Sequence, residues 1–134
     1  MPLTSSEIPE LLRSAKTVAI VGISDKPERA SYGVAQYLLE NSTFELFFVN
    51  PLLESVLGQK VYKSLKDIPV HIDIVDVFRK PADCLAVLAE SIEINAGAIW
   101  LQLGISVPEV DIQGNEAGLA VVMDRCLKID YAAL

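Results

Sequence analysis

The segment from Gly22 to Gly33 carries several groups that could bind phosphate. Ser24 and Ser31 offer hydroxyls. Lys26 and Arg29 offer positive charge. A glycine at the entry lets a backbone approach an anion closely, and a helix after the loop would add free N–H groups and the positive end of its dipole. The segment therefore predicts a diphosphate-binding loop, and the alternative is a surface connection capped by Ser31.

The spacing of the glycines does not fit the common nucleotide-binding motifs. The dinucleotide pattern G-x-G-x-x-G is absent because Ser24 stands at the second glycine and the next glycine is Gly33. A Walker loop is absent as well, since the chain has no G-K-[ST] sequence. Asn50 and Pro51 stand where a dinucleotide-binding domain has an acidic residue for the ribose. These observations favour a nucleotide whose diphosphate uses a longer loop.

Other chemically able residues support weaker predictions. Arg79 directly follows an apolar run and must reach solvent or an anion. The run 124–126, Asp-Arg-Cys, could be catalytic, but a surface Asp–Arg pair and a buried thiol are the favoured interpretation. His71 has no acid or nucleophile at a suggestive spacing, and we expect it to face solvent in a loop. Phe78 and Trp100 could belong to the site or to the core.

Apolar patterning predicts the elements that position these residues. Runs typical of buried strands alternate with amphipathic stretches typical of helices. We expect strands at 17–22, 46–49, 72–78, 98–103 and 119–123, and helices at 32–40, 82–94 and 126–134, after a short amphipathic segment at 8–14. The prediction is a single α/β, Rossmann-like, doubly wound domain over residues 1–134, with a five-stranded parallel sheet in the order 3-2-1-4-5. Residues 52–69 are less patterned, with a turn and a short extended piece near 58–62, and we place no chemistry there.

Composition narrows the classes of function. The chain has 134 residues, of which 51% are hydrophobic, and this suits one domain with its own core. A formal net charge of −7 argues against a general DNA or RNA binder. No apolar run approaches the ~20 residues needed to span a bilayer, and the first residues do not resemble a signal peptide, so we expect a cytoplasmic protein. The two cysteines form no C-x-x-C pair, and neither a metal site nor a disulfide framework is predicted.

Five ordered blocks of the sequence carry a family resemblance over nearly the whole chain. They are Val21 to Ser24 with Pro27, Arg29, Ser31, Gly33 and Val34; Val49 to Pro51; Val75 to Arg79; Trp100 to Gly104; and Val121 to Cys126 with Lys128 and Ile129. With these blocks the chain resembles the small stand-alone CoA-binding domain proteins, which are related to the N-terminal CoA-binding domain of succinyl-CoA synthetase α subunits.

The resemblance implies a site for coenzyme A. The pyrophosphate would lie on the first loop, the adenosine between the ends of the second and third predicted strands, and the pantetheine near the end of the fourth. The implied residues are Gly22, Ile23, Ser24, Lys26, Arg29, Ser31, Tyr32 and Gly33 for the pyrophosphate; Val49, Asn50 and Pro51, with Val77, Phe78 and Arg79, for the adenosine; and Gln102 and Gly104 for the pantetheine. In the synthetases a lysine two residues beyond the matching proline contacts the nucleotide, and here Leu53 stands there. The 3′-phosphate would then rely on Lys26, Arg29 or Arg79, or remain solvated.

These observations predict a binding module for CoA or a short acyl-CoA. No catalytic or metal-binding residues are predicted, and neither nucleic acid nor a membrane is an expected partner. Two alternatives remain: a small NAD(P)-dependent or acyl-CoA-handling enzyme, and a regulatory partner that senses CoA.

Overall fold

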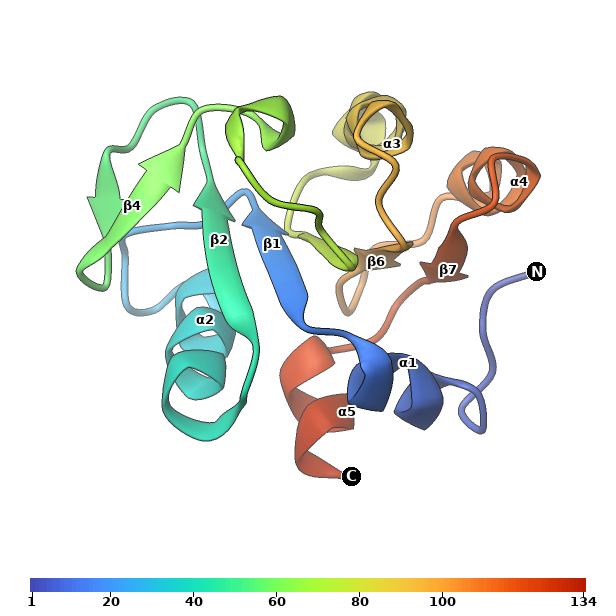
Figure 1. Cartoon of the computed structure of the whole chain (residues 1–134), viewed down its shortest axis with the longest axis horizontal. Helices are drawn as coiled ribbons and strands as arrows, with labels where there is room; N and C mark the ends of the chain where they lie inside the picture. Colours follow the sequence, from blue (N-terminus) through green and yellow to red (C-terminus); the bar gives the residue numbers. More distant parts are fainter.

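The computed structural model describes residues 1–134 and shows one seven-stranded sheet with helices on both faces (Figure 1). The elements in chain order are α1 (Ile8–Ser14), β1 (Thr17–Val21), α2 (Ala30–Asn41), β2 (Glu45–Val49), β3 (Ser55–Val56), β4 (Gln59–Tyr62), the 3-10 turn η1 (Leu65–Asp67), β5 (Ile74–Val77), η2 (Pro81–Asp83), α3 (Cys84–Glu93), β6 (Ala98–Leu101), α4 (Pro108–Glu116), β7 (Ala120–Val122) and α5 (Leu127–Ala132). The α/β, Rossmann-like architecture expected from the sequence is therefore confirmed.

The strand count and the strand order differ from the prediction. The sheet has the order β3-β4-β2-β1-β5-β6-β7, and every pair is parallel except β3 with β4. The strand expected third, β5, pairs with β1 on the side away from β2, with Val18 opposite Ile74. The place beyond β2 belongs to β4, which was expected only as a short extended piece near residues 58–62 and not as a strand of the sheet. The prediction of a five-stranded sheet was thus wrong, because the sheet has seven strands. The position beyond β2, where the third predicted strand was expected, is occupied by β4.

The composition of β4 explains why it was not predicted as a strand of the sheet. Its sequence is Gln-Lys-Val-Tyr, and only Val61 is buried. It pairs with β2 over two residues and with the two-residue strand β3 on its other side. A short strand close to the edge of a sheet buries little and needs no apolar run, so it leaves a weak pattern in the sequence.

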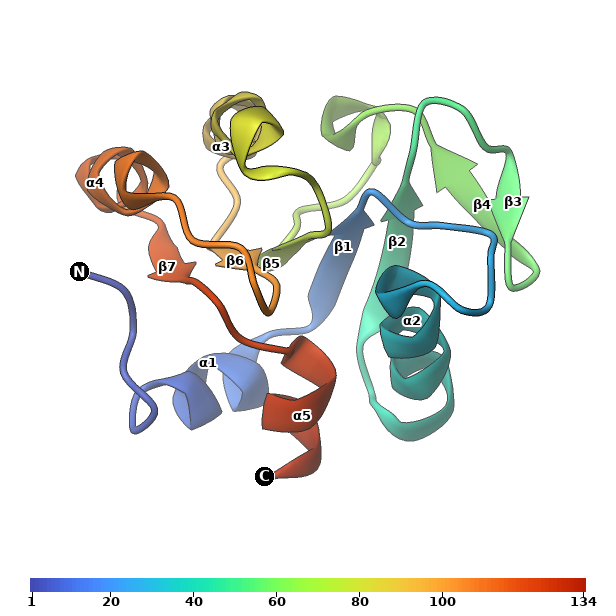
Figure 2. The same cartoon turned by 180° about the vertical axis from the view of Figure 1, so that it is seen from behind.

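Two hydrophobic layers hold the sheet between the helices. On one face α3 and α4 pack over residues such as Val75 and Ile99. On the other face α1, α2 and α5 cover a second layer that includes Ile20 and Trp100 (Figure 2). Trp100 is fully buried, and its Nε1 donates a hydrogen bond to the Arg125 carbonyl oxygen at 2.8 Å, so this side chain belongs to the core. Both faces of the central strands are covered, as expected for a parallel sheet.

The helix α4 was not identified individually from the sequence. Only Val110 and Gly114 are buried within it, so it lacks the apolar stripe of an amphipathic helix. A Cβ at Gly114 would lie 2.8 Å from Cγ2 of Val121, which shows how closely this helix approaches the sheet. Close backbone approach through glycine replaces large apolar side chains here, and periodicity alone does not reveal it. No helix of the structure combines the length and the apolar character needed to cross a membrane.

Candidate functional site

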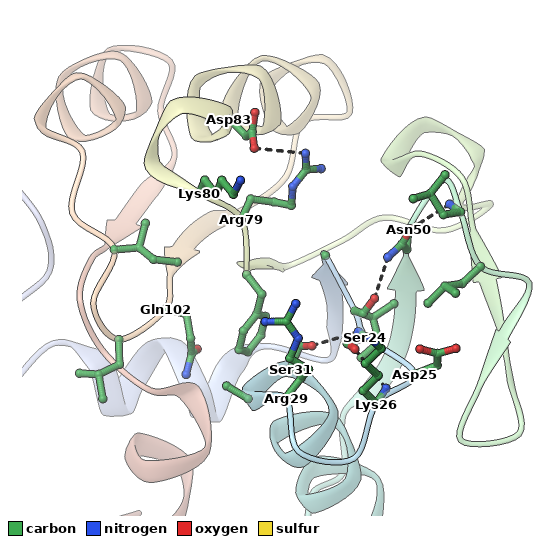
Figure 3. A pocket seen from close by; sticks show the side chains of 18 of the residues that line it. Ser24, Asp25, Lys26, Arg29, Ser31, Asn50, Arg79, Lys80, Asp83 and Gln102 are labelled. Carbon is green, nitrogen blue, oxygen red and sulfur yellow. Dashed lines mark hydrogen bonds and ion pairs between the residues drawn. The ribbon is translucent and has the colours of Figure 1, made fainter.

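A cleft of about 860 Å³ opens at the carboxyl ends of β1, β2, β5 and β6. It lies above the end of β1, which has β2 on one side and β5 on the other. The strand order reverses at this place, and ligands bind there in open α/β sheets. Figure 3 shows side chains of the β1–α2 loop on one side of the cleft and those that follow β5 on the other. Its volume is typical of sites for small molecules and cofactors.

Gly22 directly follows β1 and lines the floor of this cleft. Its φ is +86°, a conformation that favours glycine, and an added Cβ would lie 2.5 Å from the Phe78 carbonyl oxygen. The Gly22 N–H donates to the Val49 carbonyl oxygen at 2.9 Å, and the Phe78 N–H donates to that of Val21 at 2.8 Å. The ends of β1, β2 and β5 are therefore joined tightly under the cleft, and only glycine allows that approach.

Ser31 organises the β1–α2 loop. Its side chain is almost fully buried, and its Oγ accepts a hydrogen bond from the Ser24 N–H at 3.0 Å (Figure 3). The residue before α2 is Arg29, and no side chain caps the helix, so Ser31 does not have the capping role considered above. The first N–H groups of α2 have no acceptor within the helix, and Arg29, Ala30 and Ser31 line the cleft. This helix end can therefore donate hydrogen bonds to an anion.

Asn50 connects the loop to the turn after β2. Its Nδ2 donates to the Ile23 carbonyl oxygen at 2.8 Å, and its Oδ1 accepts from the Leu52 N–H at the same distance (Figure 3). Its own N–H donates to the Tyr62 carbonyl oxygen at 2.9 Å. Both ends of the amide are thus engaged by backbone, and Asn50 positions the wall of the cleft.

The opposite wall is formed by the residues that follow β5. Arg79 Nη2 lies 3.3 Å from Asp83 Oδ2, and both side chains are about two-fifths exposed (Figure 3). Cys84 is buried just behind them, with its Sγ 3.4 Å from the Lys80 carbonyl oxygen. Burial, reinforced by the Asp83 charge and opposed by Arg79, raises the pKa of the Cys84 thiol. This cysteine is therefore a structural thiol and a poor nucleophile.

The charged side chains around the cleft are mostly positive, whereas the chain as a whole is negatively charged. Lys26, Arg29, Arg79 and Lys80 line it, against two carboxylates, those of Asp25 and Asp83. Four cations and two anions leave a local excess of positive charge in a protein whose net charge is −7. Such an arrangement can attract a small anion although the protein as a whole repels polyanions.

A second, smaller cavity of about 320 Å³ lies on the α3 side of the same strand ends. Val21, Val49 and Val87 give it an apolar lining, and Arg79 and Asp83 line both cavities. Lys63, Ser64, Pro51, Ala86 and Glu90 complete its walls.

The structure brings most of the expected site residues together. Ten of them line the main cleft: Gly22, Ile23, Ser24, Lys26, Arg29, Ser31, Asn50, Phe78, Arg79 and Gln102. Val49 and Pro51 line the second cavity instead. The other four do not line either cavity: Tyr32 and Gly33 lie within α2, Val77 is buried in β5, and the Gly104 N–H donates to Asp124 Oδ1 at 2.7 Å.

Sequence reasoning missed several residues of these walls. They are Asp25, Ala30, Leu52, Lys80, Pro81, Asp83, Leu103 and Ile105 in the cleft, and Lys63, Ser64, Ala86, Val87 and Glu90 in the second cavity. Many directly neighbour predicted residues in the same loops, so extending each strand-end motif by a few positions would have found them. Lys63 and Ser64 follow β4 and could be found only once that strand was recognised.

The remaining candidates have structural surroundings. Arg125 pairs with Asp130 at 2.7 Å, and not with Asp124, and Cys126 is only partly buried, so the expected Asp–Arg pair and buried thiol are corrected in detail. His71 is exposed in a loop as expected, but the expectation that no acid stands near it was wrong, because its Nδ1 lies 3.3 Å from Asp73 Oδ1. No group of three or more His, Cys, Asp or Glu side chains is arranged to hold a metal ion.

A mostly parallel sheet covered on both faces, with an electropositive cleft and a glycine turn at the carboxyl end of its first strand, defines a Rossmann-type α/β domain. Residues 16–132 match the family described as the CoA binding domain, and the chain belongs to that family.

Some known proteins resemble this chain over nearly its whole length, and others over only a part of it. YneT, an uncharacterized protein of Bacillus subtilis (strain 168), is 37% identical over 129 residues, which cover 96% of this chain and 95% of YneT. The solved structure of a hypothetical protein from Pyrococcus horikoshii OT3 superposes with a TM-score of 0.93 at 38% identity, over 100% of this chain and 96% of that one. The α subunit of the ADP-forming acetate–CoA ligase II of Pyrococcus furiosus is 37% identical over 57 residues, which are 42% of this chain and 12% of that subunit.

Proposed function

We propose that residues 1–134 form a binding domain for coenzyme A or a short acyl-CoA, with the diphosphate held by the β1–α2 loop. The observation that carries this proposal is the uncapped start of α2 facing a cleft with an excess of positive charge. The Ser24–Ser31 hydrogen bond holds the loop in place, and Lys26 and Arg29 lie beside the helix end. Backbone N–H groups and cations together are the usual partners of a diphosphate.

The residues that line the cleft indicate where the adenosine and the pantetheine of CoA would lie. Asn50 and Leu52 line the cleft where β2 ends, and the second cavity begins at the neighbouring Pro51, on the α3 side of the same strand ends. We place the adenosine there. Gln102 lies across the cleft from Asn50, and Leu103 and Ile105 follow it (Figure 3). Leu103 is 63% exposed, so a pantetheine arm lying there would cover apolar surface.

The comparisons support CoA as the ligand. The family match spans residues 16–132, and the Pyrococcus furiosus relative is by name a CoA ligase subunit. Its similarity covers only 12% of that subunit, so we carry over the ligand and not the ligase reaction.

The residue that follows β2 favours CoA over NAD as the ligand. A dinucleotide-binding domain places a carboxylate there for the ribose hydroxyls. Here that position is Asn50, whose amide is already bonded to Ile23 and Leu52. The two carboxylates that line the cleft, Asp25 and Asp83, come from the loops after β1 and β5.

Thermal unfolding with a panel of ligands tests the proposal. CoA, acetyl-CoA, NAD, NADP and ATP are each added in excess, because a ligand at 100 times its dissociation constant stabilises a protein by about 2.7 kcal/mol. We expect CoA or acetyl-CoA to raise the melting temperature more than the other three. An equal or larger shift with NAD or ATP would overturn the assignment.

A further inference from the structure

Lys63 directly follows β4 and lines the second cavity, where we place the adenosine. Its segment has no recognisable sequence motif. Val49 and Tyr62 are paired in the parallel strands β2 and β4, so Asn50 and Lys63 leave the sheet side by side. The Lys63 Nζ lies 3.4 Å from the Pro51 carbonyl oxygen. This contact holds the ammonium group against the turn that follows β2.

The surroundings of Lys63 suit an anion beside an apolar group. The second cavity has valines in its lining, and Lys63, Ser64 and Arg79 supply its polar donors. Its two acids are Asp83, which is paired with Arg79, and Glu90 on α3. Lys63 is exposed and forms no ion pair, so its charge is available to a ligand.

The phosphates of CoA require cations at two places. The diphosphate would bind Lys26 and Arg29 beside the start of α2. The 3′-phosphate is attached to the ribose of the adenosine and therefore needs a cation elsewhere. Leu52 and Leu53 line the cleft in the turn after β2 and carry no charge. We propose that Lys63 binds the 3′-phosphate of CoA and thereby determines the preference for CoA over nucleotides that lack this group. This inference rests on the proposed function and adds a residue to it.

Calorimetric titration of two ligands against two proteins tests the role of Lys63. CoA and 3′-dephospho-CoA differ only in the 3′-phosphate, and the proteins are the wild type and Lys63→Met. We expect the wild type to bind CoA about tenfold more tightly, which corresponds to about 1.4 kcal/mol. Lys63→Met should bring the two affinities within about twofold of each other and leave binding of 3′-dephospho-CoA unchanged.

Three further variants sharpen the result. Lys63→Gln should lose the preference as Lys63→Met does, and Lys63→Arg should keep it. Lys66→Met is the matched control, because Lys66 is exposed in η1 and lines neither cavity. A wild type without preference, a Lys63→Met protein that keeps it, or equal loss for both ligands would overturn the role of Lys63. Absence of binding by the wild type to either ligand would overturn the proposed function itself.

Discussion

Arg29 is the cation closest in sequence to the start of α2, and it has no structural role that competes with ligand binding. It is exposed, it takes part in no ion pair, and it precedes the helix in an extended conformation. Arg29→Ala is therefore expected to weaken CoA binding by about 10- to 100-fold, the value of a charge-assisted hydrogen bond to phosphate. Calorimetric titration with CoA measures this loss.

Two other variants show whether Arg29 acts on the ligand or on the fold. Arg13→Ala removes an exposed arginine from α1, away from the cleft, and should change neither affinity nor stability. Val21→Ala creates a cavity in the core strand and should cost about 2 kcal/mol of unfolding free energy. If Arg29→Ala lowers the melting temperature of the free protein as much as Val21→Ala does, Arg29 is structural and the phosphate assignment fails.

Asp76 is a buried acid that the site does not use. It lies in β5 between Ile20 and Trp100 of the neighbouring strands, it is fully buried, and neither carboxyl oxygen has a hydrogen-bond partner. Burial raises the pKa of Asp76 well above its usual value. An ionised carboxylate at this place would cost far more than a neutral one, so the side chain holds its proton in the folded protein.

The raised pKa of Asp76 makes stability depend on pH. The folded state keeps a proton that the unfolded state releases above its usual pKa, so stability falls as pH rises from about 4 through the folded pKa. Asp76→Asn has nearly the same shape and does not ionise. We expect the two proteins to be about equally stable near pH 4, and the variant to become progressively more stable as the pH rises. Urea unfolding at several pH values measures the difference, and parallel pH profiles would show that Asp76 does not hold its proton.

The β1–α2 loop and the turn after β2 are held together because Asn50 forms hydrogen bonds with both. Asn50→Ala removes both amide hydrogen bonds and leaves the Ile23 carbonyl and the Leu52 N–H without these partners. We expect a loss of roughly 1–2 kcal/mol in unfolding free energy, together with weaker CoA binding because the loop is no longer positioned. Urea unfolding and calorimetry measure the two effects.

Asn41→Ala is the matched control for Asn50→Ala. Asn41 also donates from its Nδ2 to a backbone carbonyl, that of Tyr37, but it is exposed at the end of α2 and away from the cleft. Its replacement should change stability little and affinity not at all. Unchanged CoA affinity in Asn50→Ala would mean that the loop holds its conformation without the amide.

The elements that could be predicted are those with a strong apolar signal. β1, β5 and β6 are short strands buried on both faces and apolar apart from Thr17 in β1 and Asp76 in β5, and each was expected near its observed position. α4 was not expected, and β4 was expected only as a short extended piece, because α4 meets the sheet through Gly114 and β4 buries only Val61. The candidate site residues named from the sequence are, for the same reason, mainly those next to predicted strands, and their role in binding stays a prediction. Lys63 was not, since its place depends on the pairing of β4 with β2 and no local pattern records that pairing.

Charge is distributed unevenly over the protein. The chain carries a net charge of −7, but four cations and two acids surround the cleft where the loops of β1 and β5 meet. Long-range attraction of a polyanion depends on the summed charge, whereas binding of a small anion depends on the few groups that touch it. The protein should therefore select small phosphate compounds and exclude nucleic acid.

Salt and competition experiments test this consequence of the charge distribution. The screening length is about 10 Å at 0.1 M salt, so contacts between CoA and adjacent cations are weakened but not abolished as salt is added. We expect CoA affinity to fall by no more than about tenfold between about 0.05 and 0.5 M salt, because few cations take part and the helix N–H groups are less sensitive to screening. Duplex DNA at physiological salt should neither shift in a gel with the protein nor displace CoA. A clear gel shift under these conditions, or loss of CoA binding across this salt range, would show that the acidic surface does not govern partner choice as proposed.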